Sequence, residues 1–205
     1  IVIGVVIVGT MVAPVQAQTP PFTRTVIVNA TNNPLVNGAA LLSAVAGIPP
    51  SAGPNQPWLV KVEPGIFDLG GTQLVMRNFV DIEGSGRDTT YVTSDVSQIA
   101  DGSATVRVPQ DVECELRELT VRNTSESSGA GVEIDSDEFL LTEVNVETKV
   151  GRDAVGVRTR KSSPRLNEVF LRVLAGRDAT GVLIASGGTV ITDSLVFVSS
   201  PGATN

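Results

Sequence analysis

Five charged residues in the second half of the sequence have the types and spacing of a binding site for an acidic ligand. Glu133 and Asp135 are two positions apart, Arg158 and Arg160 follow 25 positions after them, and Lys161 is adjacent to Arg160. Carboxylates beside guanidinium and ammonium groups can hold an anionic polysaccharide through charge-assisted hydrogen bonds. Opposite charges paired across strands on a solvated face are the alternative interpretation. We treat these five residues as a candidate substrate-binding surface and assign no catalytic residue.

A second series at the same spacing contains only acids: Glu118, Glu143, Glu168 and Asp193. Four carboxylates stacked about 4.8 Å apart would repel one another unless a cation or hydrogen bonds intervened. Oxygen ligands of this kind suit Ca²⁺, so the series is a candidate metal site, and no other cofactor is expected. The alternative is that the four side chains point into water near lysines and arginines.

Both series belong to a repeat of 25 residues. Residues 130–154, 155–179 and 180–204 align without a gap, and the preceding row joins in register through its second half. Its first half, 104–108, is out of step by one residue. Two of the aligned columns are uniform in character: Gly131, Gly156 and Gly181; and Leu116, Leu141, Leu166 and Ile191.

The repeat predicts a parallel β-helix in which each row is one coil. Apolar residues alternate within each row, as in strands, and Gly, Asp, Ser and Pro separate the short runs. A period in the twenties indicates a solenoid, because one coil cannot bury its apolar side without stacked neighbours. The spacing of leucine-rich repeats is absent, and a propeller blade needs about 40 residues. The Leu116 column should then form one inward stack along the solenoid axis.

The N-terminal part divides into a leader and a cap. Residues 1–17 are apolar, uncharged and end in Val-Gln-Ala, which predicts a partial secretory signal peptide and a secreted or cell-surface protein. Residues 18–57 are predicted to hold a strand and a capping helix, with Asn33 at the N-cap and Pro34 at the first helical position. One helical face, which should cover the first coil, holds Leu35, Ala39, Leu42 and Ala46. Residues 58–205 form the coils.

Composition removes several classes of function. The chain has no histidine and a formal net charge of −7, which excludes histidine-dependent catalysis and histidine-containing metal sites. The negative charge disfavours nucleic acid and anionic membranes as partners. Cys114 is the single cysteine, so no internal disulfide can form, and it is expected to fill a core position. The sequence does not indicate an oligomeric state.

Two segments resemble a known fold family. After the helix, PGIF at 64–67 follows a strand, and VDIEGSGRDTT occupies 80–90. These segments resemble the opening of the pectin-lyase-like superfamily of right-handed parallel β-helices, and most closely the entry coils of pectinesterases. The resemblance implies an all-β fold, and it places Glu133 and Arg158 on the sheet whose outer face holds the substrate groove in pectin-active relatives. The Asp pair, Gln pair and Arg of the pectinesterase catalytic motifs have no counterparts in this sequence.

Two functions remain from these observations. The first is a secreted, non-catalytic β-helix module that binds polysaccharide or serves as a rigid element at the cell surface. The second is a pectinesterase-like or lyase-like enzyme acting on acidic polysaccharide, which the usual activity of the resembling family implies. The missing catalytic motifs favour the first.

Overall fold

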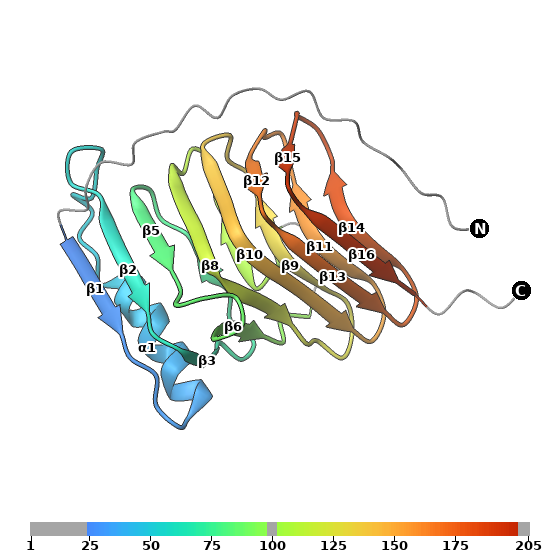
Figure 1. The fold of residues 1–205 in the computed structure, drawn as a ribbon, viewed down its shortest axis with the longest axis horizontal. Coiled ribbons are helices and arrows are strands. Elements are labelled where there is room, and N and C mark those ends of the chain that lie inside the picture. Colours follow the sequence, from blue (N-terminus) through green and yellow to red (C-terminus); the bar gives the residue numbers. More distant parts are fainter. Residues whose placement is uncertain (1–23, 98–101, 201–205) are drawn as a thin grey trace, which may run out of the picture.

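The computed structural model describes residues 24–97 and 102–200 and shows a solenoid of about six turns with roughly 25 residues per coil (Figure 1). The fold class predicted from the repeat is therefore confirmed. The predicted leader, residues 1–17, lies outside the described residues.

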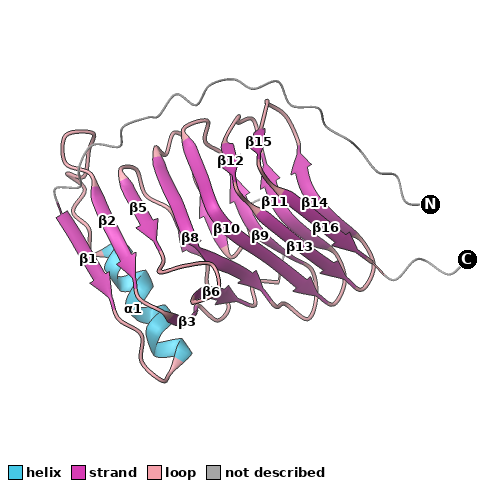
Figure 2. Ribbon diagram, viewed as in Figure 1, coloured by secondary structure: helices cyan, strands magenta, loops and turns pink. Residues whose placement is uncertain are grey.

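Every ladder between the named strands is parallel, and the strands form two sheets (Figure 2). In the large sheet the main order is β1 (Arg24–Val28), β2 (Trp58–Val62), β5 (Val80–Glu83), β8 (Cys114–Asn123), β10 (Phe139–Val150), β12 (Arg165–Asn167) and β15 (Val190–Thr192). The same sheet has further strands that lie off this main order, and we call them its second half: β3 (Gly65–Asp68), β6 (Thr90–Ser94), β13 (Phe170–Ala175) and β16 (Leu195–Ser199). The five-stranded sheet has the order β14 (Ala179–Ile184), β11 (Ala154–Thr159), β9 (Gly129–Ile134), β7 (Val106–Val108) and β4 (Leu74–Val75).

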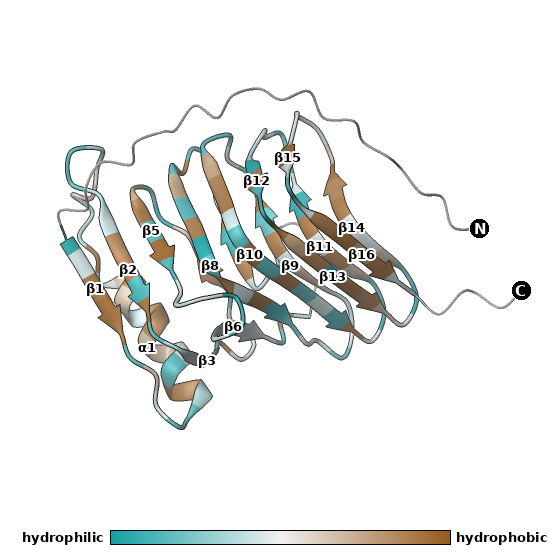
Figure 3. Ribbon diagram, in the orientation of Figure 1, coloured by the Kyte–Doolittle hydropathy of each residue, from teal (hydrophilic) through white to brown (hydrophobic). Residues whose placement is uncertain are grey.

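The strand register reproduces the sequence columns. Leu141 pairs with Leu116 on one side and Leu166 on the other, and Leu166 pairs with Ile191. Val106 pairs with Val132, a spacing of 26, which confirms the expected one-residue offset in that row. Because parallel strands place equivalent residues directly above one another, apolar residues recur at matching places on successive strands of the large sheet (Figure 3).

The predicted inward stack is buried at three of its four positions. Leu116 and Leu141 are 0% exposed and Leu166 is 1% exposed, whereas Ile191 is 42% exposed. Ile191 keeps its place in the column, but no described coil lies beyond the one formed by β14, β15 and β16. Exposure at Ile191 therefore reflects its position in the last described coil and not a different register.

The recurrent glycines mark close contact between the two sheets. A Cβ atom on Gly131 would lie 2.3 Å from Cγ1 of Val146, and one on Gly181 would lie 2.4 Å from Cγ1 of Val196. On Gly156 it would lie 2.9 Å from Cγ2 of Val173 in the large sheet, and 2.6 Å from the carbonyl oxygen of Gly181 in the neighbouring coil. These distances are well below contact, so the column needs glycine because there is no space for a side chain.

The capping helix α1 (Pro34–Ala46) is present, but the predicted buried face is wrong. The Asn33 side chain accepts hydrogen bonds from the backbone N–H groups of Leu35 and Val36, as an N-cap should. The buried helix residues are Asn37, Gly38, Leu41 and Val45, while Leu35 and Ala39 are exposed.

The packing of α1 explains this rotation. A Cβ on Gly38 would lie 1.9 Å from the carbonyl oxygen of Asp68, so the helix backbone rests directly on the segment that leaves β3. The Asn37 amide donates to the carbonyl oxygen of Ile66 at 2.9 Å and so binds the helix to β3. Close backbone approach and this polar contact outweigh the burial of the helix face that contains Leu35.

Among the described residues, no helix has both the length and the apolar character that a membrane span requires.

Candidate functional site

Four of the five predicted substrate-binding residues come together on the outer face of the five-stranded sheet. Arg158 pairs in register with Glu133 on β9, and both alternate along their strands with the core residues Val132 and Val157, which places them on the opposite face. We call Glu133, Asp135, Arg158 and Arg160 the outer-face cluster. The spacing of 25 residues places them in neighbouring coils, as the sequence predicted.

A network of short ion pairs holds this cluster. Nη2 of Arg160 lies 2.6 Å from Oε1 of Glu133, and Nε of Arg160 lies 3.2 Å from Oδ1 of Asp135. Nη1 of Arg158 lies 3.2 Å from Oε2 of Glu133. The backbone N–H of Gly102 also donates to Oε1 of Glu133 at 2.7 Å. Every oxygen of the Glu133 carboxylate thus has a partner.

Burial corrects the expected role of Arg158. The sequence placed Arg158 and Arg160 in an exposed positive patch, but the Arg158 side chain is only 5% exposed and that of Glu133 is 0% exposed. The chain segment at Gly102 lies over this part of the sheet and contacts Glu133 directly. Both side chains are therefore held in a buried ion pair.

The fifth predicted residue, Lys161, lies at an open groove beside the cluster, which Asp135 and Arg160 also line. The groove has a volume of about 740 Å³, and its charged lining residues are Asp111, Asp135, Asp137, Glu138, Arg160 and Lys161. Ala185 and Ser186 from the next coil complete one wall. We call this the mixed-charge groove. Its lining has four carboxylates and two cations, so it is net acidic where the sequence predicted a positive surface.

The acidic series predicted as a metal site is a series of backbone corners. Glu118, Glu143, Glu168 and Asp193 have φ values of 55°, 52°, 53° and 47°, in the left-handed region. Each residue turns the chain between the two halves of the large sheet, as Glu168 does between β12 and β13. Within residues 24–97 and 102–200, no group of three or more acidic or other ligating side chains could hold a metal ion. A left-handed φ favours Gly, Asn and Asp, so the backbone alone does not account for Glu at three of these four corners, and the metal site stays a prediction.

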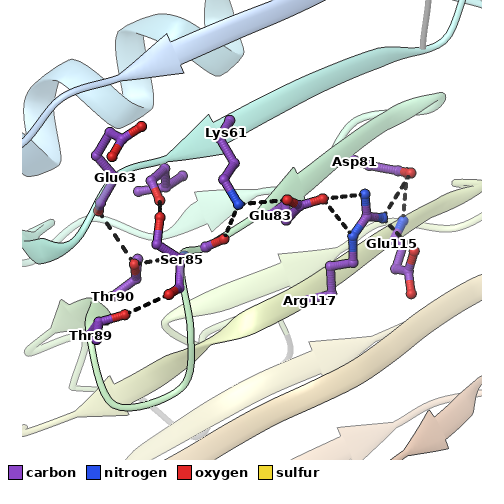
Figure 4. Close-up of polar contacts among 11 residues, drawn as sticks. Lys61, Glu63, Asp81, Glu83, Ser85, Thr89, Thr90, Glu115 and Arg117 are labelled. Carbon is purple, nitrogen blue, oxygen red and sulfur yellow. Dashed lines mark hydrogen bonds and ion pairs between the residues drawn. The ribbon is translucent and has the colours of Figure 1, made fainter. Parts of the chain in front are cut away.

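The first coils carry a charged network that the sequence pattern did not predict (Figure 4). Lys61, Glu83 and Arg117 occupy one column of β2, β5 and β8. Glu83 accepts from Nζ of Lys61 at 2.6 Å and from Nη2 of Arg117 at 2.6 Å. Their separations along the chain are 22 and 34 residues, so the 25-residue alignment could not reveal them.

Two further acids complete this network. Nη1 of Arg117 donates to Oε2 of Glu115 at 2.6 Å, and the backbone N–H of Glu115 donates to Oδ1 of Asp81 at 2.8 Å. Burial raises the pKa of Asp81 to about 6, while that hydrogen bond and the charge of Arg117 act in the opposite direction. All five charged side chains are engaged with one another, which is the arrangement of a structural network. Cys114 beside it is buried, as expected, and burial raises the pKa of its thiol.

Comparisons with known proteins identify the fold and not the activity. No protein-family model matches the sequence, and neither does any curated protein. A solved structure of a pectin methylesterase in complex with a hexasaccharide is similar, with a TM-score of 0.50 and 13% identity over 79% of this chain. The pectin methylesterase PemA from Erwinia chrysanthemi has a TM-score of 0.48 and 12% identity over 76%. The chain spans 62% and 56% of the lengths of these two proteins.

Proposed function

We propose that this chain, whose fold resembles that of the pectin-lyase-like parallel β-helices, is a non-catalytic extracellular module that binds polysaccharide in the mixed-charge groove. The observation that carries the proposal is the open, polar groove of about 740 Å³, whose lining residues follow the C-terminal ends of β7, β9, β11 and β14 in the five-stranded sheet. Its volume falls within the range of about 300–1,000 Å³ found for small-molecule sites.

The lining of the groove offers both donors and acceptors for sugar hydroxyl groups. The carboxylates of Asp137 and Glu138 accept hydrogen bonds, Lys161 donates them, and the hydroxyl of Ser186 can do either. The side chains of Asp137, Glu138 and Lys161 are exposed. Parallel coils with a fixed register support this surface, so its polar groups are held in place before a ligand arrives.

The charge of the groove favours an uncharged sugar chain over an acidic one. Four carboxylates and two cations line it, so an acidic polysaccharide would meet a net negative surface. Neutral sugars, or uronic acids neutralised as esters, avoid this repulsion. The acidic polysaccharide predicted from the five charged residues is therefore not the ligand that we propose for this groove.

The outer-face cluster supports binding rather than catalysis. Glu133 is buried, and Asp135 is held by Arg160 at 3.2 Å, so neither presents an unengaged carboxylate to a bound ester or glycosidic bond. The alternative of a pectinesterase-like or lyase-like enzyme rests on the family resemblance alone. The extracellular location is proposed from the apolar segment at 1–17, because it has the composition of a signal peptide.

A variant that fills the groove tests the proposal. Ala185 is exposed and lines the groove, and its backbone N–H donates to the carbonyl oxygen of Thr159, a bond that a new side chain does not remove. Ala185→Trp should weaken binding of methyl-esterified or neutral oligosaccharides at least tenfold in an NMR titration. The matched control is Ile27→Trp, which adds the same ring at an exposed position on β1, distant from the groove.

The proposal requires that the wild type and Ile27→Trp bind alike and that Ala185→Trp does not. Equal binding by all three proteins would place the ligand elsewhere. A wild type that binds none of these sugars would refute a polysaccharide-binding role for the groove.

A further inference from the structure

A different surface, on the second half of the large sheet, has an uncompensated positive charge. Arg122 on β8, Glu147 on β10 and Arg172 on β13 lie in one register column, and all three line a small groove of about 260 Å³. Lys149, Thr124 and Leu174 complete the lining. We call this the basic groove. It contains three cations and one carboxylate on a chain whose net charge is −7.

The single carboxylate is already used. Nε and Nη2 of Arg122 both lie 2.7 Å from Oε2 of Glu147, and the Arg122 guanidinium lies 4.9 Å from the centre of the Tyr91 ring. Among residues 24–97 and 102–200, no hydrogen-bond or ion-pair partner is present for the side chains of Lys149 and Arg172, and both are exposed. The groove therefore presents two available cations beside a neutralised pair.

The positions of the two cations allow them to act on one ligand. Glu147 pairs in register with Arg172, and Lys149 is two residues beyond Glu147 on the same strand face. Diagonal neighbours of this kind have Cβ atoms about 7–8 Å apart, within reach of long side chains. The guanidinium can bind a carboxylate or sulfate through two parallel hydrogen bonds, while the ammonium adds a point charge.

An apolar surface lies beside these cations. Phe197 on β16 pairs in register with Arg172 and is 50% exposed, and Leu174 lines the groove itself. The apolar face of a sugar ring can rest on such side chains while its acidic group meets the cations. A folded protein partner needs about 800 Å² on each side, and a nucleic acid needs many neutralised phosphates. Two available cations in a small groove suit neither of these.

We propose that the basic groove binds an acidic oligosaccharide, with Arg172 and Lys149 holding its anionic groups and Phe197 supporting a ring. This site is separate from the mixed-charge groove, because it lies on the other sheet and shares no residue with it. A polysaccharide that alternates neutral and acidic regions could use both. The proposal does not depend on ligand binding at the mixed-charge groove.

The test is an NMR titration of the wild type and Lys149→Ala/Arg172→Ala with a carboxylated, a sulfated and an uncharged oligosaccharide of equal length. The wild type should bind at least one acidic ligand, and the stronger of the two identifies the anionic group. The double variant should lose about tenfold or more of that affinity. Wild-type binding should also weaken with added salt, since exposed charges are screened within about 8 Å at physiological ionic strength.

A charge-matched control separates a site from a general charge effect. Arg152→Ala/Arg165→Ala removes two exposed arginines that lie outside the groove, and should bind acidic ligand like the wild type. Ala185→Trp should also bind it normally, even if it loses neutral sugars. The proposal is overturned if the wild type binds neither acidic ligand, if Lys149→Ala/Arg172→Ala binds as the wild type does, or if the control loses as much affinity.

Discussion

The buried ion pair of Glu133 and Arg158 provides the sharpest test of how the outer-face cluster is held. Their closest atoms are 3.2 Å apart, and the side chains are 0% and 5% exposed. With an effective dielectric constant of about 20, two unit charges at that distance interact by about 5 kcal/mol. Breaking one such pair usually costs about 3–5 kcal/mol, since the remaining charge is left buried.

The structure predicts unequal costs for the two single changes. Arg158→Met leaves Glu133 bound to Arg160 and to the N–H of Gly102, so its cost should be near 3 kcal/mol. Glu133→Met removes the carboxylate that both arginines share, so its cost should be near 5 kcal/mol. Methionine is chosen because it fills a comparable volume with apolar atoms.

The double variant separates electrostatic pairing from packing. With both charges gone, no unpaired charge remains from this pair, and Glu133→Met/Arg158→Met should be more stable than the sum of the singles by about 2 kcal/mol or more. Urea unfolding followed by circular dichroism measures all four proteins. Strict additivity, or a greater loss for Arg158→Met than for Glu133→Met, would refute the inference that Glu133 is the centre of the cluster.

Three further predictions concern the core, the first coils and catalysis. Leu141→Ala should cost about 2–5 kcal/mol of unfolding free energy, whereas Ile191→Ala in the same column, 42% exposed, should cost less than about 1 kcal/mol in the same urea assay; equal costs would contradict the stacked register. Because burial raises the pKa of Asp81 from 3.8 to about 6, this carboxyl binds more protons in the folded protein than in the unfolded chain between those values, and its contribution to stability should fall by about 3 kcal/mol as the pH rises through 6. Asp81→Asn should flatten that part of the stability–pH curve, and an unchanged slope would argue against the burial effect. The chain should neither de-esterify nor cleave pectin; turnover that disappears in Asp135→Asn or Arg160→Met would restore the enzyme alternative.

The sequence alone determined the fold and the alignment of its coils. A strict period fixes which residues stack, because in parallel ladders every equivalent residue lies directly over the next. The column from Leu116 to Ile191, the pairing of Glu133 with Arg158, and the one-residue offset at Val106 could all be read from the spacing. The helix limits also followed from local signals at Asn33 and Pro34, because capping depends on neighbouring residues only.

What surrounds each column was decided by tertiary structure. The period gives neighbours along the axis but says nothing about segments that cross a sheet, so the covering of Glu133 by Gly102 and the burial of Arg158 were missed. The face of α1 that packs on β3 was decided by the contact between Gly38 and the backbone at Asp68. Likewise, the first coils differ in length, and only the folded register aligns Lys61, Glu83 and Arg117 in one column. Charge and hydrophobicity are properties of residues, but exposure depends on the segments that fold over them, and those lie far away in the sequence.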